Sequence, residues 1–418
     1  GLLHHKKIIL HVIDDLVHWI EFDRMGSILG LVGNWMIYLV PVIGGLVVGL
    51  ISHFFIGKER YQGIAGIMES VALGGGRLPY RKIPVKTVAS ALSIGSGASV
   101  GPADPSLQIG AYLGSMFGQL LRLSDERIRT LVASGVAGGI AAAFNAPITG
   151  IFFALEIIIG DLRVNAFGIV ALAAVAASVF TQAVSGANPA FHIPAYTFNS
   201  VWELPLYFGL GVLSGLSAAF YIRLHHFTRD IFDTWNAPRW FKPVAAGLAV
   251  SLVGIYLPQV LGTGYATIGN ILDGKPLSVT LLLSLALSRL VLTPICISGG
   301  FHGGVFAPAL FSGASLGGAY GLVAKQVFPS LNISPPAFAM VGMAAVLAGT
   351  IHAPITSFML LFEMTHDYRI ILPLIAAVNV SLFLSWHLQH DSVYTLGLAR
   401  KGIRLQRGRD VGVLETIT

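Results

Sequence analysis

Charged side chains are scarce in this chain, and their scarcity excludes an ordinary soluble domain. Only 11% of the 418 residues are Asp, Glu, Lys or Arg, whereas soluble domains carry roughly a quarter. Cysteine is nearly absent as well: Cys296 is the single one, so no disulfide can form within the chain. Apolar residues make up 54% instead, and the mean hydropathy is +0.75. The composition therefore predicts a polytopic membrane protein.

The basic residues outnumber the acidic ones, 26 to 20, which gives a net charge of +6. They do not form a stripe with interleaved aromatic residues, so nucleic acid is not an expected partner. They gather instead in three clusters, at residues 4–7, 77–86 and 400–409. The positive-inside rule assigns such clusters to the cytoplasmic side. We therefore expect a multi-pass protein of the inner (plasma) membrane with both termini in the cytoplasm.

Apolar residues at helical spacing run through nearly the whole chain, which predicts an all-α fold. Residues 1–26 mix apolar and polar positions and predict an amphipathic helix at the membrane interface. Hydrophobic helical segments follow at about 27–56, 84–98, 106–121, 125–142, 147–160, 163–184, 202–229, 240–258, 277–292, 304–325, 335–349, 354–364 and 370–389. Several are shorter than the about 20 residues that an upright helix needs to cross a bilayer. Short segments interrupted by Gly and Pro indicate broken helices that meet near the midplane; the alternative is tilted or re-entrant helices that bind nothing.

Two patterns in the sequence occur twice. Pro105, Leu107, Gly110, Ala111, Leu113 and Gly114 reappear 203 positions later as Pro308, Leu310, Gly313, Ala314, Leu316 and Gly317. Gly135, Ala146–Thr149 and Glu156 reappear 207 positions later as Gly342, Ala353–Thr356 and Glu363. We therefore predict two membrane repeats, residues 27–200 and 201–395. Paired broken helices in corresponding positions indicate a binding site between the repeats.

A glycine-rich loop inside the first repeat, residues 95–110, opens directly into a helical pattern. Irregular backbone at membrane depth occurs only where it is buried in protein or lines a polar cavity. A helix that begins there presents unpaired N–H groups and a partial positive charge. The loop therefore predicts an anion site and anion permeation.

These residues resemble the CLC family of chloride channels and chloride/proton antiporters, over about residues 27–400. Three family signatures are matched at Gln62-Gly63-Ile64-Ala65, at Gly101–Gln108 and at Gly304–Pro308, and a family tyrosine is matched by Tyr394. The resemblance implies two inverted-topology repeats of tilted and broken helices. It further implies one anion pathway per subunit and a homodimer that pairs through residues 147–184 and 354–389, with no cofactor.

The resemblance also implies the site residues. The backbone N–H groups of Val305 and Phe306 and the hydroxyl of Tyr394 would bind chloride or a similar monovalent anion. Donors without a full positive charge bind weakly enough for the ion to leave. Without the repeat, Phe306 would be interpreted as a packed aromatic residue and Tyr394 as an interfacial one. The other anion-binding positions implied are Gln62, Gly63, Gly101, Ala103 and Asp104, and no metal or catalytic residue is predicted.

Two positions depart from the family pattern in a way that bears on protons. The gating glutamate of the family falls on Ala103, and the second proton-carrying glutamate of many exchangers falls on Ile157. Neither side chain can carry a proton, so we expect passive conduction without stoichiometric proton coupling. Glu156 remains as a possible proton or ion-pair residue, but a hydrogen-bond network at a helix end is the favoured interpretation for it and for Glu363.

Asp104 is the acidic residue left beside the gating position. It directly precedes Pro105, an order typical of an N-cap and a first helical turn, so we expect it to cap its own helix. The alternative is that it replaces the missing glutamate and makes the chain a chloride/proton exchanger. Pro102 removes one backbone N–H, and Gln62 replaces a small polar residue, so the anion sites are predicted to be altered. A third possibility is an anion sensor that binds without appreciable flux.

A serine motif, a histidine and the C-terminal residues remain to be interpreted. Residues 97–101 fit G-x-S-x-G, which would make Ser99 the nucleophile of a hydrolase, but no Asp or His is arranged as its partner. The chain is therefore predicted not to be an enzyme. His302, beside the third signature, is a candidate for mutation because a histidine side chain can titrate near neutral pH. Residues 396–418 are expected to be a cytoplasmic tail that leads into an absent CBS domain.

Overall fold

The computed structural model describes residues 38–57, 63–161, 164–186, 201–331, 333–365, 367–399 and 402–403. The interfacial helix predicted in residues 1–26, the site residue Gln62 and the tail from residue 404 lie outside them. The described helices are α3 (Val40–Ile51), α4 (Gly63–Leu73), α5 (Ile83–Gly95), α6 (Ala103–Leu120), α7 (Asp125–Phe144), α8 (Pro147–Phe153), α9 (Val164–Ser185), α10 (Leu204–Thr234), α11 (Lys242–Tyr256), α12 (Tyr265–Leu272), α13 (Val279–Gly299), α14 (Phe306–Val327), α15 (Pro335–Ile351), α16 (Pro354–Thr365), α17 (Ile371–Leu388) and α18 (Thr395–Ala399).

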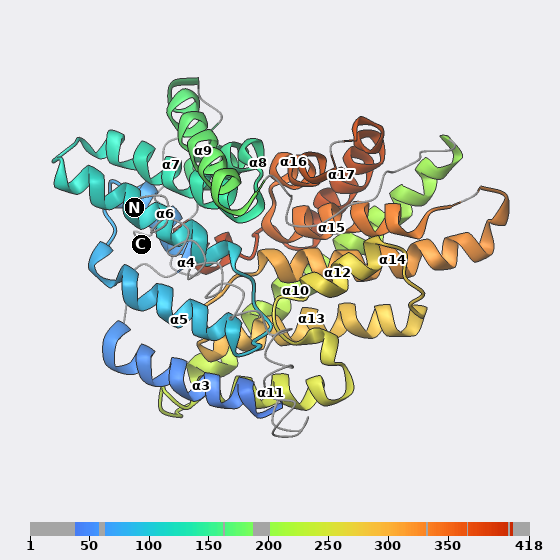
Figure 1. Cartoon of the computed structure of the whole chain (residues 1–418), viewed down its shortest axis with the longest axis horizontal. Helices are drawn as coiled ribbons and strands as arrows, with labels where there is room; N and C mark the ends of the chain where they lie inside the picture. The colour runs from blue at the N-terminus through green and yellow to red at the C-terminus, as the bar shows by residue number, and fades with distance from the viewer. Residues whose placement is uncertain are drawn as a thin grey trace, which may run out of the picture.

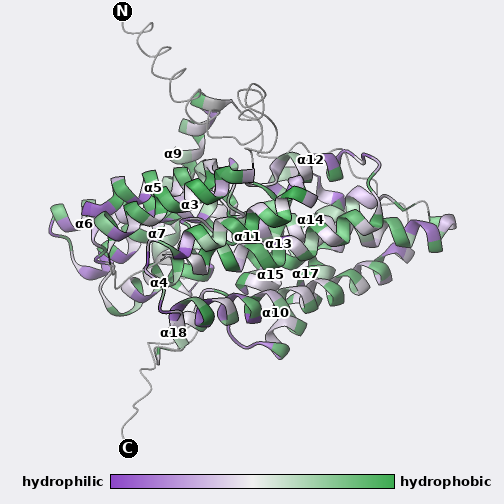
Figure 2. Ribbon diagram, turned by 90° about the horizontal axis from the view of Figure 1, so that it is seen from below, coloured by the Kyte–Doolittle hydropathy of each residue, from purple (hydrophilic) through white to green (hydrophobic). Residues whose placement is uncertain are grey.

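The described part of the chain has the character of a polytopic membrane protein. Helices α9, α10, α13, α14 and α17 are long and apolar enough to cross a membrane. Helices α3, α4, α8, α11 and α15 are apolar but shorter. Figure 2 shows hydrophobic residues along most of the helices, with hydrophilic residues gathered toward loops and helix ends. The prediction of an all-α membrane fold with broken helices is therefore confirmed.

The predicted helical segments match the observed ones to within a few residues at most ends, with informative exceptions. The sequence patterns missed α4, α12 and α18, which have 11, 8 and 5 residues. They are too short to give a clear helical period. Helix α13 also continues past the predicted end at 292, because Pro294 is accommodated inside it.

Each repeat contributes a closely packed helix pair, α6 with α7 and α14 with α15 (Figure 1). Glycines let the backbones touch. A Cβ at Gly110 would lie 2.0 Å from the carbonyl oxygen of Gly135, and a Cβ at Gly313 would lie 2.4 Å from that of Gly342. These glycines belong to the repeated patterns, so the same crossing is built twice.

The two repeats exchange helix caps. The carboxylate of Glu363 accepts hydrogen bonds from the N–H groups of Ile148 and Thr149 at the start of α8, at 2.8 and 2.6 Å. The carboxylate of Glu156 likewise accepts from Ile355 and Thr356 at the start of α16, at 3.4 and 3.0 Å. Because each contact recurs with the two copies interchanged, the halves are related by an approximate two-fold axis. The helix-end interpretation of both glutamates is confirmed.

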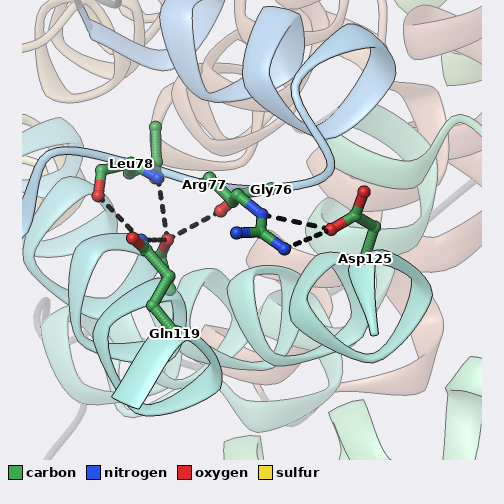
Figure 3. Close-up of polar contacts among 6 residues, drawn as sticks. Gly76, Arg77, Leu78, Gln119 and Asp125 are labelled. Atoms are coloured by element: carbon green, nitrogen blue, oxygen red, sulfur yellow. Dashed lines mark hydrogen bonds and ion pairs between the residues drawn. The ribbon is translucent and has the colours of Figure 1, made fainter. Parts of the chain in front are cut away.

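A side-chain network fastens the loop before α5 to the end of α6 (Figure 3). The hydroxyl of Ser115 accepts from the N–H of Leu78 at 2.8 Å and donates to the carbonyl of Gly76 at 2.7 Å. The amide nitrogen of Gln119 donates to the carbonyl of Leu78 at 3.0 Å. Arg77 pairs with Asp125 at 2.9 Å on the exposed side. The network fixes α5 beside α6, whose amino end carries the candidate site.

Candidate functional site

The amino ends of α6 and α14 meet where the two repeats come together. The N–H of Gly101 donates to the carbonyl of Gly304 at 3.0 Å, and the N–H of Gly304 donates to the carbonyl of Gly101 at 2.9 Å. These glycines are 203 positions apart, so they are the same position in the two copies. A Cβ at Gly101 would lie 2.8 Å from the Cβ of Ala307, so the approach requires glycine. The bridge sets two helix amino termini face to face.

Asp104 lies beside this bridge, in the first turn of α6, and its side chain is buried. The hydroxyl of Tyr394, also buried, donates to Oδ1 of Asp104 at 3.3 Å. The backbone N–H of Val305 is hydrogen-bonded to the same carboxylate. A Cβ at Gly304 would lie 2.3 Å from Cγ of Asp104, so the carboxylate packs directly on that glycine. The carboxylate therefore stands at the amino end of α14.

The prediction that Asp104 caps its own helix is wrong. The N-cap of α6 is Pro102, with no side-chain cap hydrogen bond, and the helix has already begun at Ala103. Asp104 instead reaches the donors of Val305 and Tyr394, because the glycine bridge brings the amino end of α14 within range of a short side chain. The sequence offered no signal for this contact, which joins residues 290 positions apart.

The remaining predicted site residues lie as follows. Val305 is the residue before α14 and Phe306 is its first residue, and both are buried. The Phe306 ring packs on Phe144, with ring centroids 5.3 Å apart. Gly63 begins α4 with a φ of +61°. The fold thus brings Gly101, Ala103, Asp104, Val305 and Tyr394 to one locality, whereas a Cβ at Gly63 would meet no atom within 4 Å.

The two positions that depart from the family pattern are apolar and enclosed. Ala103 has 1% of its surface exposed and Ile157 has 6%. Ile157 lies in a π-helical turn, Ala154–Ile159, next to the capping residue Glu156. Glu156 is committed to the start of α16, with 2.8 Å between its Oε2 and the hydroxyl oxygen of Thr356. Neither of the two positions therefore carries an acidic side chain.

Ser99 and His302 have structural partners. The Ser99 hydroxyl is fully buried and lies 3.3 Å from that of Thr293, so its neighbour in hydrogen-bonding geometry is a threonine rather than a histidine base. This arrangement gives no support to a hydrolase. The Nε2 of His302 lies 2.9 Å from the Ser52 hydroxyl, and its backbone N–H donates to Ser93 at 3.0 Å. His302 therefore links the loop before α14 to Ser52, just after α3, and to Ser93 of α5.

One charged residue of this region was not singled out from the sequence. Arg289 of α13 is fully buried, and it donates to the backbone carbonyls of Val260, Gly262 and Thr263 at 2.6, 2.7 and 2.5 Å. The sequence did point to Arg289, because it is the single arginine in an otherwise apolar helical segment. An ionisable residue inside a membrane segment is by default a candidate functional residue.

Comparisons with known proteins bear on this arrangement. A family model described as "Voltage gated chloride channel" matches residues 44–385. The chain belongs to the voltage-gated chloride channel (CLC) family. Among relatives of this CLC chain is a ClcB-like chloride channel protein of Ralstonia nicotianae, 35% identical over 370 residues that make up 88% of this chain and 86% of that protein. Another is a protein named H(+)/Cl(-) exchange transporter ClcA in Vibrio cholerae, 31% identical over 94% of this chain and 87% of that protein.

Other relatives are longer. The protein named CLC-e in Arabidopsis thaliana is 36% identical over 88% of this chain, but the match spans 54% of the plant protein's length. Among solved structures, a slow cyanobacterial Cl-/H+ antiporter superposes with a TM-score of 0.82 at 25% identity, over 93% of this chain and 92% of the other. CLC relatives of this chain therefore include proteins named as channels and proteins named as exchangers.

Proposed function

We propose that this CLC protein conducts chloride or a similar monovalent anion passively, without stoichiometric movement of protons. The observation that carries the proposal is the replacement of both proton-carrying positions of the family pattern by buried apolar residues, Ala103 and Ile157. A methyl or an aliphatic side chain can neither bind a proton nor compete with an anion. Glu156 does not compensate, because its carboxylate serves the amino end of α16.

In this proposal the anion passes the donors that now face Asp104. An ionised carboxylate in front of the Val305 N–H and the Tyr394 hydroxyl uses the groups that a permeant anion would use. Asp104 therefore acts as a tethered competitor, and ions pass when its carboxylate turns away or takes up a proton.

The second candidate is a chloride/proton exchanger in which Asp104 carries the proton. The contact between Asp104 and Tyr394 favours it, because it gives a buried acidic group access to the candidate anion site. The two candidates differ in one respect: an exchanger must move protons in a fixed ratio to chloride, and a passive pathway must not.

The test is chloride efflux from proteoliposomes, with valinomycin and potassium setting the voltage, recorded together with the external pH. We expect chloride release with no proton uptake beyond that of protein-free vesicles. Proton uptake in a fixed ratio to chloride would overturn passive conduction and assign the coupling to Asp104. Saturable chloride binding with negligible efflux would instead identify an anion sensor.

The variant Asp104→Asn removes the competing charge but keeps the size of the side chain. We expect efflux to increase several-fold, because a neutral amide no longer competes with chloride, and proton movement to stay absent. The matched control is Asp233→Asn, at an exposed carboxylate of α10 that pairs with Arg229 at 3.8 Å. If Asp104→Asn instead abolishes a proton flux seen in the unmodified protein, the exchanger is the correct assignment.

The remaining proposals concern assembly and location. We propose a homodimer in the inner (plasma) membrane, with both chain termini in the cytoplasm. The exposed faces of α9 and α17 are apolar, with Leu172 and Phe180 on one and Leu372 and Phe383 on the other, as a buried subunit contact requires. Native mass spectrometry from detergent would give twice the mass of the 418-residue chain if the dimer is correct.

A further inference from the structure

Two segments that are distant in the sequence lie together at one end of the molecule: residues 74–82, between α4 and α5, and residues 120–130, where α6 ends and α7 begins (Figure 3). A Cβ at Gly76 would lie 3.0 Å from the backbone nitrogen of Arg129. Gly76 also has a φ of +77°, so the first segment lies directly against the start of α7 only with glycine there. The two segments therefore present their side chains to the same surroundings.

This end of the molecule is strongly basic, because the two segments carry six basic side chains and two acidic ones. Its exposed arginines, called the arginine patch below, are Arg77, Arg81, Arg122, Arg127 and Arg129. Arg77 pairs with Asp125 at 2.9 Å, whereas no ion pair or side-chain hydrogen bond among the described residues includes the other four. Like charges that gather on one surface repel one another, so a counter-charge supplied from outside would stabilise the patch.

Exposed apolar side chains border the arginine patch. Phe117, Leu120 and Leu121, in the last turn of α6 and directly after it, have 54%, 61% and 66% of their surface exposed. Leu73, the last residue of α4, has 45% exposed. In a membrane protein such side chains face the hydrocarbon of the bilayer, and basic side chains directly beyond them reach the headgroups. The boundary between apolar and basic residues therefore indicates the level of the membrane surface.

We propose that the arginine patch binds the phosphate groups of anionic phospholipids, with the acyl chains against Phe117, Leu120 and Leu121. A phospholipid uses both parts of this surface, since its phosphate is an anion and its chains are apolar. Arginine suits the phosphate, because the planar guanidinium is always charged and can donate two parallel hydrogen bonds to it. In the proposed topology the lipid belongs to the cytoplasmic leaflet, whose surface is negatively charged.

The inference goes beyond the proposed function and does not depend on the mode of ion transport. Helix α6 has 18 residues, so the arginine patch lies about 25 Å from the candidate site at the other end of that helix. A lipid bound there fixes the carboxyl end of α6 at the membrane surface, and with it the depth of the helix. An acidic protein segment or a soluble phosphate would use the arginines alone and leave the apolar border exposed.

The test is native mass spectrometry of the 418-residue chain in detergent, titrated with phosphatidylglycerol or with phosphatidylcholine of the same chain length. We expect the protein to bind phosphatidylglycerol more tightly. Arg81→Gln combined with Arg122→Gln should weaken phosphatidylglycerol binding about twentyfold, which is about fivefold for each arginine, and leave phosphatidylcholine binding unchanged. Neither side chain has a partner to lose among the described residues, so thermal unfolding of this double variant should match that of the unmodified protein.

The matched control is Arg229→Gln combined with Arg369→Gln, which removes the same charge from two exposed arginines that pair with Asp233 and Asp367. We expect this control to bind phosphatidylglycerol as the unmodified protein does. Equal binding of the two lipids, or a patch variant that binds phosphatidylglycerol like the control, would overturn the inference. Glycerol 3-phosphate or a hexaglutamate peptide bound more tightly than phosphatidylglycerol would also overturn it, and would identify a soluble phosphate or an acidic protein segment as the occupant. Chloride efflux does not enter these measurements, so their failure would leave the proposed function standing.

Discussion

In the proposed function, Asp104 is the residue on which ion passage depends. Its carboxylate stands against Gly304 and accepts a hydrogen bond from Tyr394 at 3.3 Å. The neighbouring position, which carries the gating glutamate in the family pattern, is Ala103, whose methyl group is buried. We therefore propose that a competing carboxylate is supplied from one residue further along and by a shorter side chain.

Ala103→Glu should add a second competitor. At neutral pH its ionised carboxylate competes with chloride for the same donors, so we expect efflux to fall several-fold. Protonation removes that charge, so efflux should recover as the pH is lowered. Efflux from proteoliposomes at a series of pH values measures this, with Ala103→Gln as the uncharged control. An Ala103→Glu protein that conducts like Ala103→Gln at every pH would mean that position 103 does not face the pathway.

Ser115 and Arg77 give unequal expectations for stability within one network (Figure 3). Ser115→Ala leaves the buried N–H of Leu78 and the carbonyl of Gly76 without their partner, at a cost of about 1–3 kcal/mol. Arg77→Met breaks an exposed ion pair worth at most about 1 kcal/mol. Thermal unfolding in detergent should rank the two in that order, and the reverse order would contradict the assignment of the buried network.

Single residues also show what the sequence could predict. The two matching glutamates, Glu156 and Glu363, were predicted to serve hydrogen-bond networks at helix ends, and both do. Arg289 was predictable in principle, since it is a charge in an apolar helix. The reach of Asp104 was not, because it depends on how closely two loops 203 positions apart approach. The local sequence favoured an N-cap at Asp104, but its side chain bonds across the contact between the two repeats instead.

At the scale of helices, the crossings of α6 with α7 and of α14 with α15 depend on glycine. Gly110→Ala would place a methyl group 2.0 Å from the carbonyl oxygen of Gly135. Backbone cannot yield as a side chain can, so we expect a loss of at least about 3 kcal/mol or no folded protein. Gly269→Ala, inside α12, where no atom lies within 4 Å, should instead be neutral or raise stability by up to about 1 kcal/mol. Yields and thermal unfolding of both variants measure this, and a stable Gly110→Ala protein would contradict the packing.

The capping contacts of Glu156 and Glu363 between the repeats predict similar losses of stability when either is removed. Glu156→Ala and Glu363→Ala each leave two N–H groups at a helix start without an acceptor, so each should cost about 1–2 kcal/mol. The two losses should be similar, because the contacts are copies of each other. Thr130→Ala, at a hydroxyl that donates to the carbonyl of Glu126 in the same helix, α7, is the control. Unequal losses, or a Glu156→Ala protein whose proton flux changes while its stability does not, would show that Glu156 has a role beyond capping.

Helices were predictable to the extent that they are long. The spans of α6, α7, α9, α10 and α15 follow from apolar periodicity, and their predicted ends differ from the observed ones by a few residues. The short helices α4, α12 and α18 were missed, and Tyr394 directly precedes α18. Short helices hold their shape through tertiary contacts, which a local pattern does not contain.

At the scale of the whole molecule, an approximate two-fold relation explains why the site lies where it does. The bridge between Gly101 and Gly304 joins equivalent positions of the two repeats, so it lies on the axis. Both helix amino termini point to that axis, and an anion there meets partial positive charge from two directions. The family and the fold follow from this duplication, whereas the mode of transport depends on a few side chains near the axis.

The central claim is that chloride passes without a proton in exchange. The reversal potential of the purified protein in a planar bilayer, under a fixed chloride gradient and a varied pH gradient, tests it most directly. Passive conduction predicts that the reversal potential stays at the chloride equilibrium potential at every pH gradient. A reversal potential that shifts systematically with the pH gradient, in the unmodified protein but not in Asp104→Asn, would contradict the claim and make the protein an exchanger.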